Sequence, residues 1–157
     1  MAERAIGSDS DAHYRVRVCR MPGGERLPLV VDRCGLPVPL ANQWSLFIRR
    51  PRLQFNSLAE ELRTVALVYD WAHRRRIDLD TRLESGNSLQ PTEISALYQS
   101  LRYVRPSGRE SAARRLTDVR SAQAVSSKVH AVRVATAREF LLWALERTLY
   151  RLDVVGT

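Results

Sequence analysis

One segment of this chain has the pattern of an amphipathic helix more clearly than any other. Its apolar residues recur at spacings of three and four: Leu58, Leu62, Val65, Tyr69 and Ala72. Such spacing places them on one face of an α-helix. Ser57 and Glu60 form a capping box at its start, in which each side chain bonds a backbone N–H of the first turn. Three arginines at 74–76 suit the negative end of the helix dipole, so a long helix with one buried face is predicted to end there.

The N-terminal part predicts a β-hairpin. Tyr14, Val16 and Val18 alternate with arginines, and a turn at 21–24 leads to a second apolar run at 27–31. Because proline has no N–H to donate, Pro28 is expected on an exposed edge of this hairpin.

Three further helices follow from local patterns. Residues 42–50 form a short amphipathic segment that Pro51 stops, with an apolar face of Trp44, Phe47 and Ile48. Residues 91–102 begin with Pro91 at a favoured first position. A third stretch, 125–152, is apolar nearly all round at 140–145, which implies burial or a partner.

These elements predict a mainly α protein, a small helical bundle of about four to five helices preceded by a short β-hairpin. Residues 1–12 are expected to be a disordered tail, 13–38 a hairpin appendage and 39–152 the helical domain.

Composition excludes several classes. No apolar run approaches the ~20 residues that span a bilayer, and no leader-like segment opens the chain, so a cytoplasmic protein is expected. Cys19 and Cys34 are too few for a disulfide scaffold and lack partners at zinc-ligand spacing. The three histidines lie in unrelated contexts and no glycine-rich phosphate loop occurs, so no cofactor, metal, small-molecule ligand or catalytic site is expected.

Positive charge is concentrated in one quarter of the chain. Between Gln99 and Arg138, nine basic residues face two acidic ones, a net +7 out of the +8 of the whole protein. A surface of one sign is typical of proteins that follow a polyanion, and duplex DNA is the polyanion expected here. The predicted DNA-binding residues in this stretch are Arg102, Arg105, Arg109, Arg114, Arg115, Arg120, Lys128 and Arg133. Alternatively, they form a solvated face of an arginine-rich protein.

Two other groups of arginines are candidates for DNA contact. Arg74, Arg75 and Arg76 either grip a DNA backbone or only cap a helix. Arg49, Arg50 and Arg52 bracket a proline, where DNA contact and simple solvent exposure are both reasonable.

The order of segments resembles a known family. Residues 35–39 read Gly-Leu-Pro-Val-Pro, and a Trp-containing short helix, Arg49-Arg50-Pro51 and Val68-Tyr69-Asp70-Trp71-Ala72 follow. Then come 76–83, 89–94 and Phe140-Leu141-Leu142-Trp143-Ala144. Together, residues 14–145 resemble the region upstream of the catalytic domain in bacterial and phage tyrosine recombinases, or phage integrases. The resemblance implies a SAM-like core-binding domain that clamps duplex DNA at a recombination site, in a nucleoid-associated protein of the bacterial cytoplasm.

The family's catalytic residues are not matched. Its His-x-x-Arg box has two chance counterparts, at 73–76 and 130–133, and Trp143 and Tyr150 follow the second at too short a spacing. We therefore expect DNA binding without strand cleavage. Two other readings stay open: a protein-interaction module, docking a partner or sister protomer through the segment from Phe140 to Leu152, and an arginine-rich RNA-binding protein.

Overall fold

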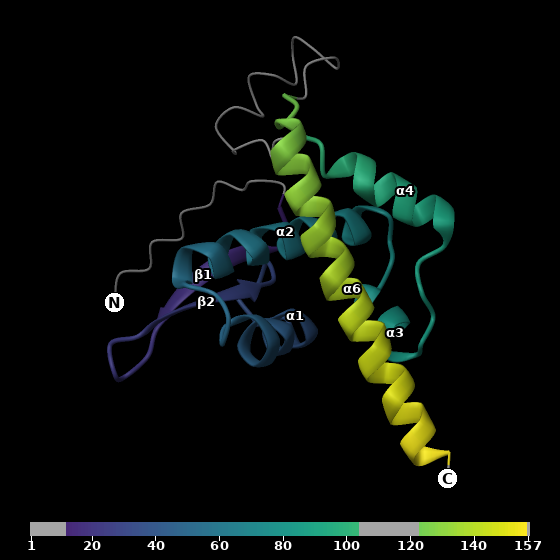
Figure 1. Ribbon diagram of the computed structural model, residues 1–157, viewed down its shortest axis with the longest axis horizontal. Helices are drawn as coiled ribbons and strands as arrows, with labels where there is room; N and C mark the ends of the chain where they lie inside the picture. Colours follow the sequence, from purple (N-terminus) through teal and green to yellow (C-terminus); the bar gives the residue numbers. More distant parts are fainter. Residues whose placement is uncertain (1–11, 104–122, 157) are drawn as a thin grey trace.

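The computed structural model describes residues 12–103 and 123–156. The elements in these ranges are β1 (Arg15–Arg20), β2 (Arg26–Val31), α1 (Pro39–Trp44), a π-helical turn η1 (Ser45–Arg49), α2 (Phe55–Arg74), α3 (Leu79–Glu84), α4 (Pro91–Ser100) and α6 (Ser127–Val155). Figure 1 shows α6 crossing α2, with the two strands of the hairpin lying along α2. A small helical bundle preceded by a β-hairpin is therefore confirmed. Within the same ranges, no helix has both the length and the apolar composition needed to cross a bilayer.

The hairpin is anchored along the outer edge of β2. The strands pair antiparallel with Val18 opposite Pro28, and Met21 N–H donates to the Glu25 carbonyl at 2.8 Å in the turn. The Val30 N–H, two residues beyond Pro28, points away from β1 and donates to Asn42 Oδ1 at 2.9 Å. The Pro28 nitrogen lies on that same outer edge by the period-two alternation of a strand. The predicted edge position is thus right, but the predicted exposure is wrong, because the Pro28 ring is fully buried.

Helix α2 starts earlier than the sequence predicted. It begins at Phe55 with Gln54 as the N-cap residue, so Ser57 lies inside the first turn and the predicted capping box is wrong. The Arg26 guanidinium lies 4.3 Å from the centre of the Phe55 ring, and Leu53 packs on the core. These tertiary contacts extend the helix upstream of its local start signal.

The apolar face expected at 42–50 is also corrected. Trp44 is buried, but Phe47 is 73% exposed and Ile48 37% exposed. The cause is η1, in which the Arg50 N–H donates five residues back, to the Ser45 carbonyl at 2.7 Å. The wider turn brings Arg49, rather than Phe47 or Ile48, over the Trp44 ring, at 5.6 Å.

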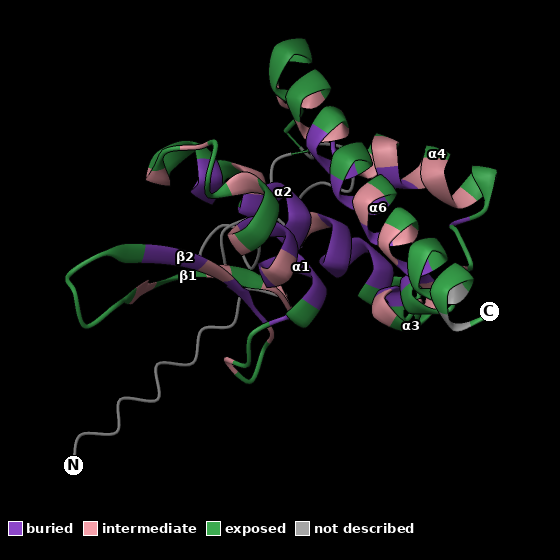
Figure 2. Ribbon diagram, turned by 60° about the horizontal axis from the view of Figure 1, so that its bottom comes forward, coloured by how far each residue is buried: buried purple, intermediate pink, exposed green. Residues whose placement is uncertain are grey.

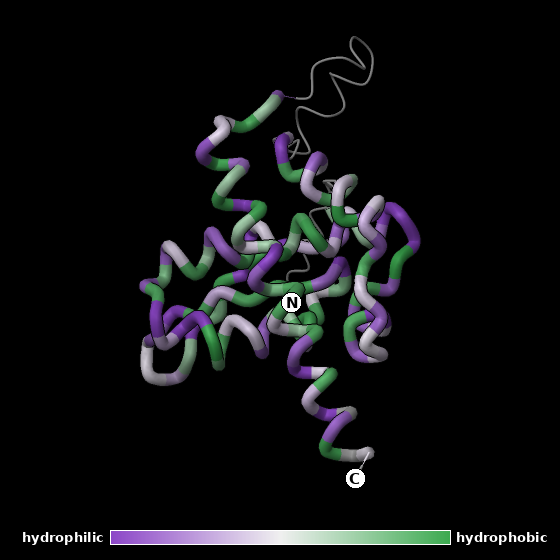
Figure 3. The backbone as a smooth tube through the Cα atoms, turned by 45° about the vertical axis from the view of Figure 1, so that its right-hand side comes forward, coloured by the Kyte–Doolittle hydropathy of each residue, from purple (hydrophilic) through white to green (hydrophobic). Residues whose placement is uncertain are grey.

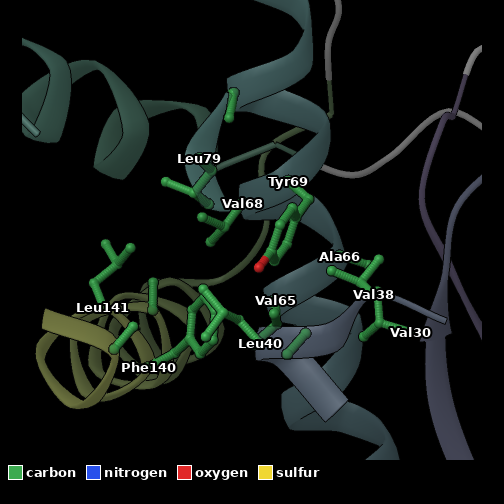
Figure 4. Packing of buried hydrophobic residues seen from close by; sticks show 14 of the residues in the cluster. Val30, Val38, Leu40, Val65, Ala66, Val68, Tyr69, Leu79, Phe140 and Leu141 are labelled. Atoms are coloured by element: carbon green, nitrogen blue, oxygen red, sulfur yellow. The ribbon is translucent and has the colours of Figure 1, made fainter. Parts of the chain in front are cut away.

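A single core joins the hairpin to the bundle, as Figure 4 shows with Val30, Val65 and Phe140 among its members. The Phe140 ring lies 5.6 Å from Trp44 and 6.0 Å from Tyr69, so α6 is fastened to both α1 and α2 by aromatic contacts. In Figure 2 the buried residues follow β2, α2 and the inner side of α6.

Helices α4 and α6 match their predicted positions closely. Pro91 opens α4, where Gln90 and Glu93 form a capping box. In α6, Phe140, Leu141 and Ala144 are buried, whereas Leu142 is 44% exposed, so the apolar stretch is not buried all round. Figures 1 and 3 show the last turns of α6 extending beyond the other elements, with hydrophobic and hydrophilic residues intermixed.

Candidate nucleic-acid interface

The C-terminus of α2 presents three arginines in a fixed turn. Ile77 N–H donates to the Ala72 carbonyl at 2.9 Å, and Arg76 N–H to the His73 carbonyl at 3.0 Å. This pair of bonds is the Schellman pattern, whose left-handed residue is usually glycine. Here Arg76 takes that position with φ of 57°. An arginine held in a conformation that disfavours side chains costs about 1 kcal/mol or more.

Two helix ends meet around one hollow of about 590 Å³, which we call the basic hollow. Its lining residues come from the end of α2 and from α4 with the two residues after it: Trp71, Arg74, Arg75, Ala96, Gln99, Ser100, Arg102 and Tyr103. The structure therefore unites three predicted DNA-binding residues, Arg74, Arg75 and Arg102, from segments 27 positions apart in the sequence.

No described lining residue of the basic hollow is acidic. Glu93 lies outside this lining, and its pKa is lowered chiefly by a hydrogen bond from Arg82 and to a smaller degree by Arg75. Glu93 is paired with Arg82, and among the described residues no ion pair joins Arg74, Arg75 or Arg102 to a carboxylate.

The floor of the basic hollow is aromatic. The Arg75 guanidinium lies 5.3 Å from the centre of the Trp71 ring, a cation–π arrangement that holds the arginine in place. Trp71 is only 3% exposed, and its Nε1 is buried without a hydrogen-bond partner.

The rim at Arg102 and Tyr103 is held rigidly by α6 and the segment before it. Arg133 donates to the Leu101 carbonyl at 3.1 Å and to the Tyr103 carbonyl at 3.0 Å. Val125 N–H donates to the Arg102 carbonyl at 2.7 Å, and Tyr103 pairs with Ala124 in a β-bridge. The last turn of α4 is thereby capped from outside.

Arg133 thus has a structural position that the sequence did not reveal. Its guanidinium bonds backbone carbonyls 30 and 32 residues away, and burial lowers its pKa. The DNA contact predicted for Arg133 stays a prediction, and its Nη1 donates within this chain. Lys128, in contrast, is exposed on the first turn of α6.

Five predicted residues lie outside the described ranges: Arg105, Arg109, Arg114, Arg115 and Arg120. The described residues Tyr103 and Ala124, on either side of the range 104–122, pair in a β-bridge at the rim of the basic hollow.

The arginines around Pro51 are separate from this surface. They precede α2 whereas Arg74 ends it, and a 20-residue helix is about 30 Å long. Arg49 donates to both carboxylate oxygens of Glu61, at 2.8 and 2.7 Å, which raises its pKa, and it also lies 3.4 Å from Glu139. Arg50 is paired with Glu25. Arg52 alone of the three is exposed with no ion-pair partner among the described residues.

A second hollow, of about 830 Å³, lies between the hairpin and the end of α2. The buried Asp70 carboxylate accepts the backbone N–H groups of His13 and Tyr14 at 3.0 and 2.9 Å, and so ties the start of the hairpin to α2. Nearby, Tyr69 Oη donates to Asp80 Oδ1 at 2.5 Å. Among the described residues, no group of three or more His, Cys, Asp or Glu side chains is arranged to hold a metal ion.

We expect Asp80 to make stability depend on pH. Burial raises its pKa, and the nearby Glu84 and Asp78 raise it further, while the Tyr69 hydrogen bond lowers it. The folded state therefore binds a proton more readily than the unfolded state, so stability falls as pH rises from the ordinary carboxyl pKa through the raised one. Asp80→Asn keeps an oxygen for Tyr69 and removes the charge. Thermal unfolding from pH 4 to 7 should show the melting temperature of the variant rising relative to that of the wild type as pH rises. A difference in melting temperature that stays constant over this range would contradict the prediction.

Comparison with protein-family models, with curated proteins and with solved structures finds no match to this chain.

Proposed function

We propose that this protein binds duplex DNA through the basic hollow and the surface around it. The observation that carries the proposal is the convergence of Arg74, Arg75 and Arg102, from the ends of two different helices, on one concave surface whose described lining residues include no acidic one. Guanidinium groups bond phosphate oxygens in pairs and remain charged at any physiological pH. Lys128 and Arg138, both exposed on α6, extend the supply of positive charge.

Part of this positive charge stabilises the ends of the protein's own helices. Arg74 and Arg75 lie at the C-terminal end of α2 and Arg102 just beyond α4, where cations interact favourably with the helix dipole. At the end of α4, however, Arg133 already bonds the carbonyls of Leu101 and Tyr103. Arg102 is therefore not needed for that cap, which supports an external anion as its partner.

The proposed role is a clamp that holds a recombination site without cutting it, in the bacterial nucleoid. The order of segments that resembles the tyrosine recombinases supports it, and so does a small helical bundle behind a hairpin. The two residues that most resemble parts of a catalytic set, His130 and Tyr150, lie on the same helix 20 positions apart, a separation of about 30 Å. One substrate phosphate cannot contact both.

Fluorescence anisotropy of a labelled duplex with inverted repeats, titrated over a series of salt concentrations, tests this function. Each phosphate neutralised contributes about 0.9 to the log–log salt slope, so three contacts at the basic hollow alone give a slope of about 3. Structured RNA is the comparison ligand, and tighter binding to it would favour the RNA-binding reading. If duplex DNA does not bind even at low salt, the proposed function is wrong.

A second candidate, self-association, has its own observation. On the second half of α6, Leu142 is 44%, Leu149 54% and Tyr150 73% exposed. Leu142 and Leu149 are seven positions apart and share one side of the helix, as in a helical pairing seam. A molecular mass that rises with protein concentration in light scattering, without DNA, would favour this candidate.

A further inference from the structure

We propose that the basic hollow receives a single unpaired nucleotide of the bound DNA, with its phosphate at the arginines and its base on Tyr103. This inference rests on the proposed function and goes further by naming the structural class of DNA that the site prefers. It follows from the shape of the hollow and from the side chains at its rim.

The shape favours more than a phosphate group. A duplex presents a convex backbone, and its phosphates need only a flat or gently curved basic surface. The basic hollow has a volume of about 590 Å³ and combines charge with an aromatic ring and an amide. A nucleotide has the same three parts: an anionic group, a flat apolar face and a polar base edge.

Tyr103 is placed to stack on that base. Its side chain is 47% exposed at the rim of the hollow. Its backbone is held on both sides, by the Arg133 guanidinium at 3.0 Å and by the bridge to Ala124. An exposed aromatic ring on a rigid backbone loses little conformational freedom when a base stacks on it.

The other lining groups supply the polar contacts. Gln99 is exposed on α4, four positions before Tyr103, and its amide has both a donor and acceptor for a base edge. Arg74 and Arg102 lie around the same hollow, with Arg75 fixed on the Trp71 ring beneath.

The test compares three labelled duplexes of one sequence: fully paired, with one unpaired nucleotide, and with an abasic residue at that same unpaired position. Base–aromatic stacking is strong enough that the duplex with the unpaired nucleotide should bind about tenfold tighter than the paired one. The abasic duplex has the same backbone and the same local flexibility, so it should show no such gain. Equal gains for both would show that flexibility, rather than the base, is recognised, and would overturn the inference.

Variants at Tyr103 complete the test. Tyr103→Leu should abolish the roughly tenfold gain, whereas Tyr103→Phe should keep the gain because it keeps the ring. Because the side chain is exposed, neither substitution should alter thermal unfolding. If all duplexes bind equally with a steep salt slope, DNA binding stands and the unpaired-nucleotide site is wrong. If none binds, the proposed function itself fails.

Discussion

Replacing Arg74, Arg75 and Arg102 together by alanine should weaken duplex binding about 100-fold at 0.1 M salt or below and lower the log–log salt slope by about 2 to 3. The three guanidinium groups surround the basic hollow, so their loss removes the contacts that release counterions from the DNA. Salt-series anisotropy measures both quantities in one experiment. Fold stability should change little, because all three side chains are exposed.

The matched control removes the same charge elsewhere. Arg20, Arg63 and Arg151 are exposed on β1, α2 and α6, and none lines the basic hollow. Their combined replacement by alanine lowers the net charge equally but should reduce the salt slope by less than 1. If the two triple variants lose affinity to the same extent, binding depends on net charge alone and the assigned surface is wrong.

Phe140→Ala should destabilise the fold by about 3–5 kcal/mol, the usual cost of removing a fully buried aromatic side chain. Phe140 has no exposed surface and joins three helices through its contacts with Trp44 on α1 and Tyr69 on α2. Urea unfolding followed by circular dichroism gives the free energy of unfolding. Phe140→Leu should cost less, because it leaves a smaller cavity.

Leu142→Ala is the control on the opposite side of α6. Leu142 is 44% exposed, so its truncation should cost below about 1 kcal/mol. Similar losses for the two alanine variants would mean that α6 does not depend on Phe140 for its place in the bundle.

Elements with local start signals were predictable from the sequence. Pro91 and the capping box of Gln90 with Glu93 are all within four residues, so the start of α4 is encoded where it occurs. The start of α2 was misplaced because contacts of Phe55 and Leu53 with other elements decide it. The exposure of Phe47 was missed because a π-helical turn shifts the period on which the apolar face was counted.

In the candidate site too, individual residues were predictable from the sequence but their arrangement was not. Arg74, Arg75 and Arg102 were each identified by charge, but their convergence depends on how α2 and α4 pack. Arg133 and Arg49 carry the same charge in the sequence, yet their partners are carbonyls and carboxylates 12 to 90 residues away. Composition alone does not separate an arginine that supports the fold from one that faces a ligand.

Asn42 gives the hairpin a closed outer edge. Its side-chain amide donates to and accepts from the backbone of Val30 at 2.9 Å, the same pair of bonds that a neighbouring strand would make. The Val38 N–H also donates to the Val30 carbonyl, at 3.0 Å. Unsatisfied strand edges recruit other chains by β-augmentation and by edge-to-edge aggregation. At Val30 this edge has no free backbone group to offer, so a third strand cannot extend the sheet there and the hairpin remains two-stranded.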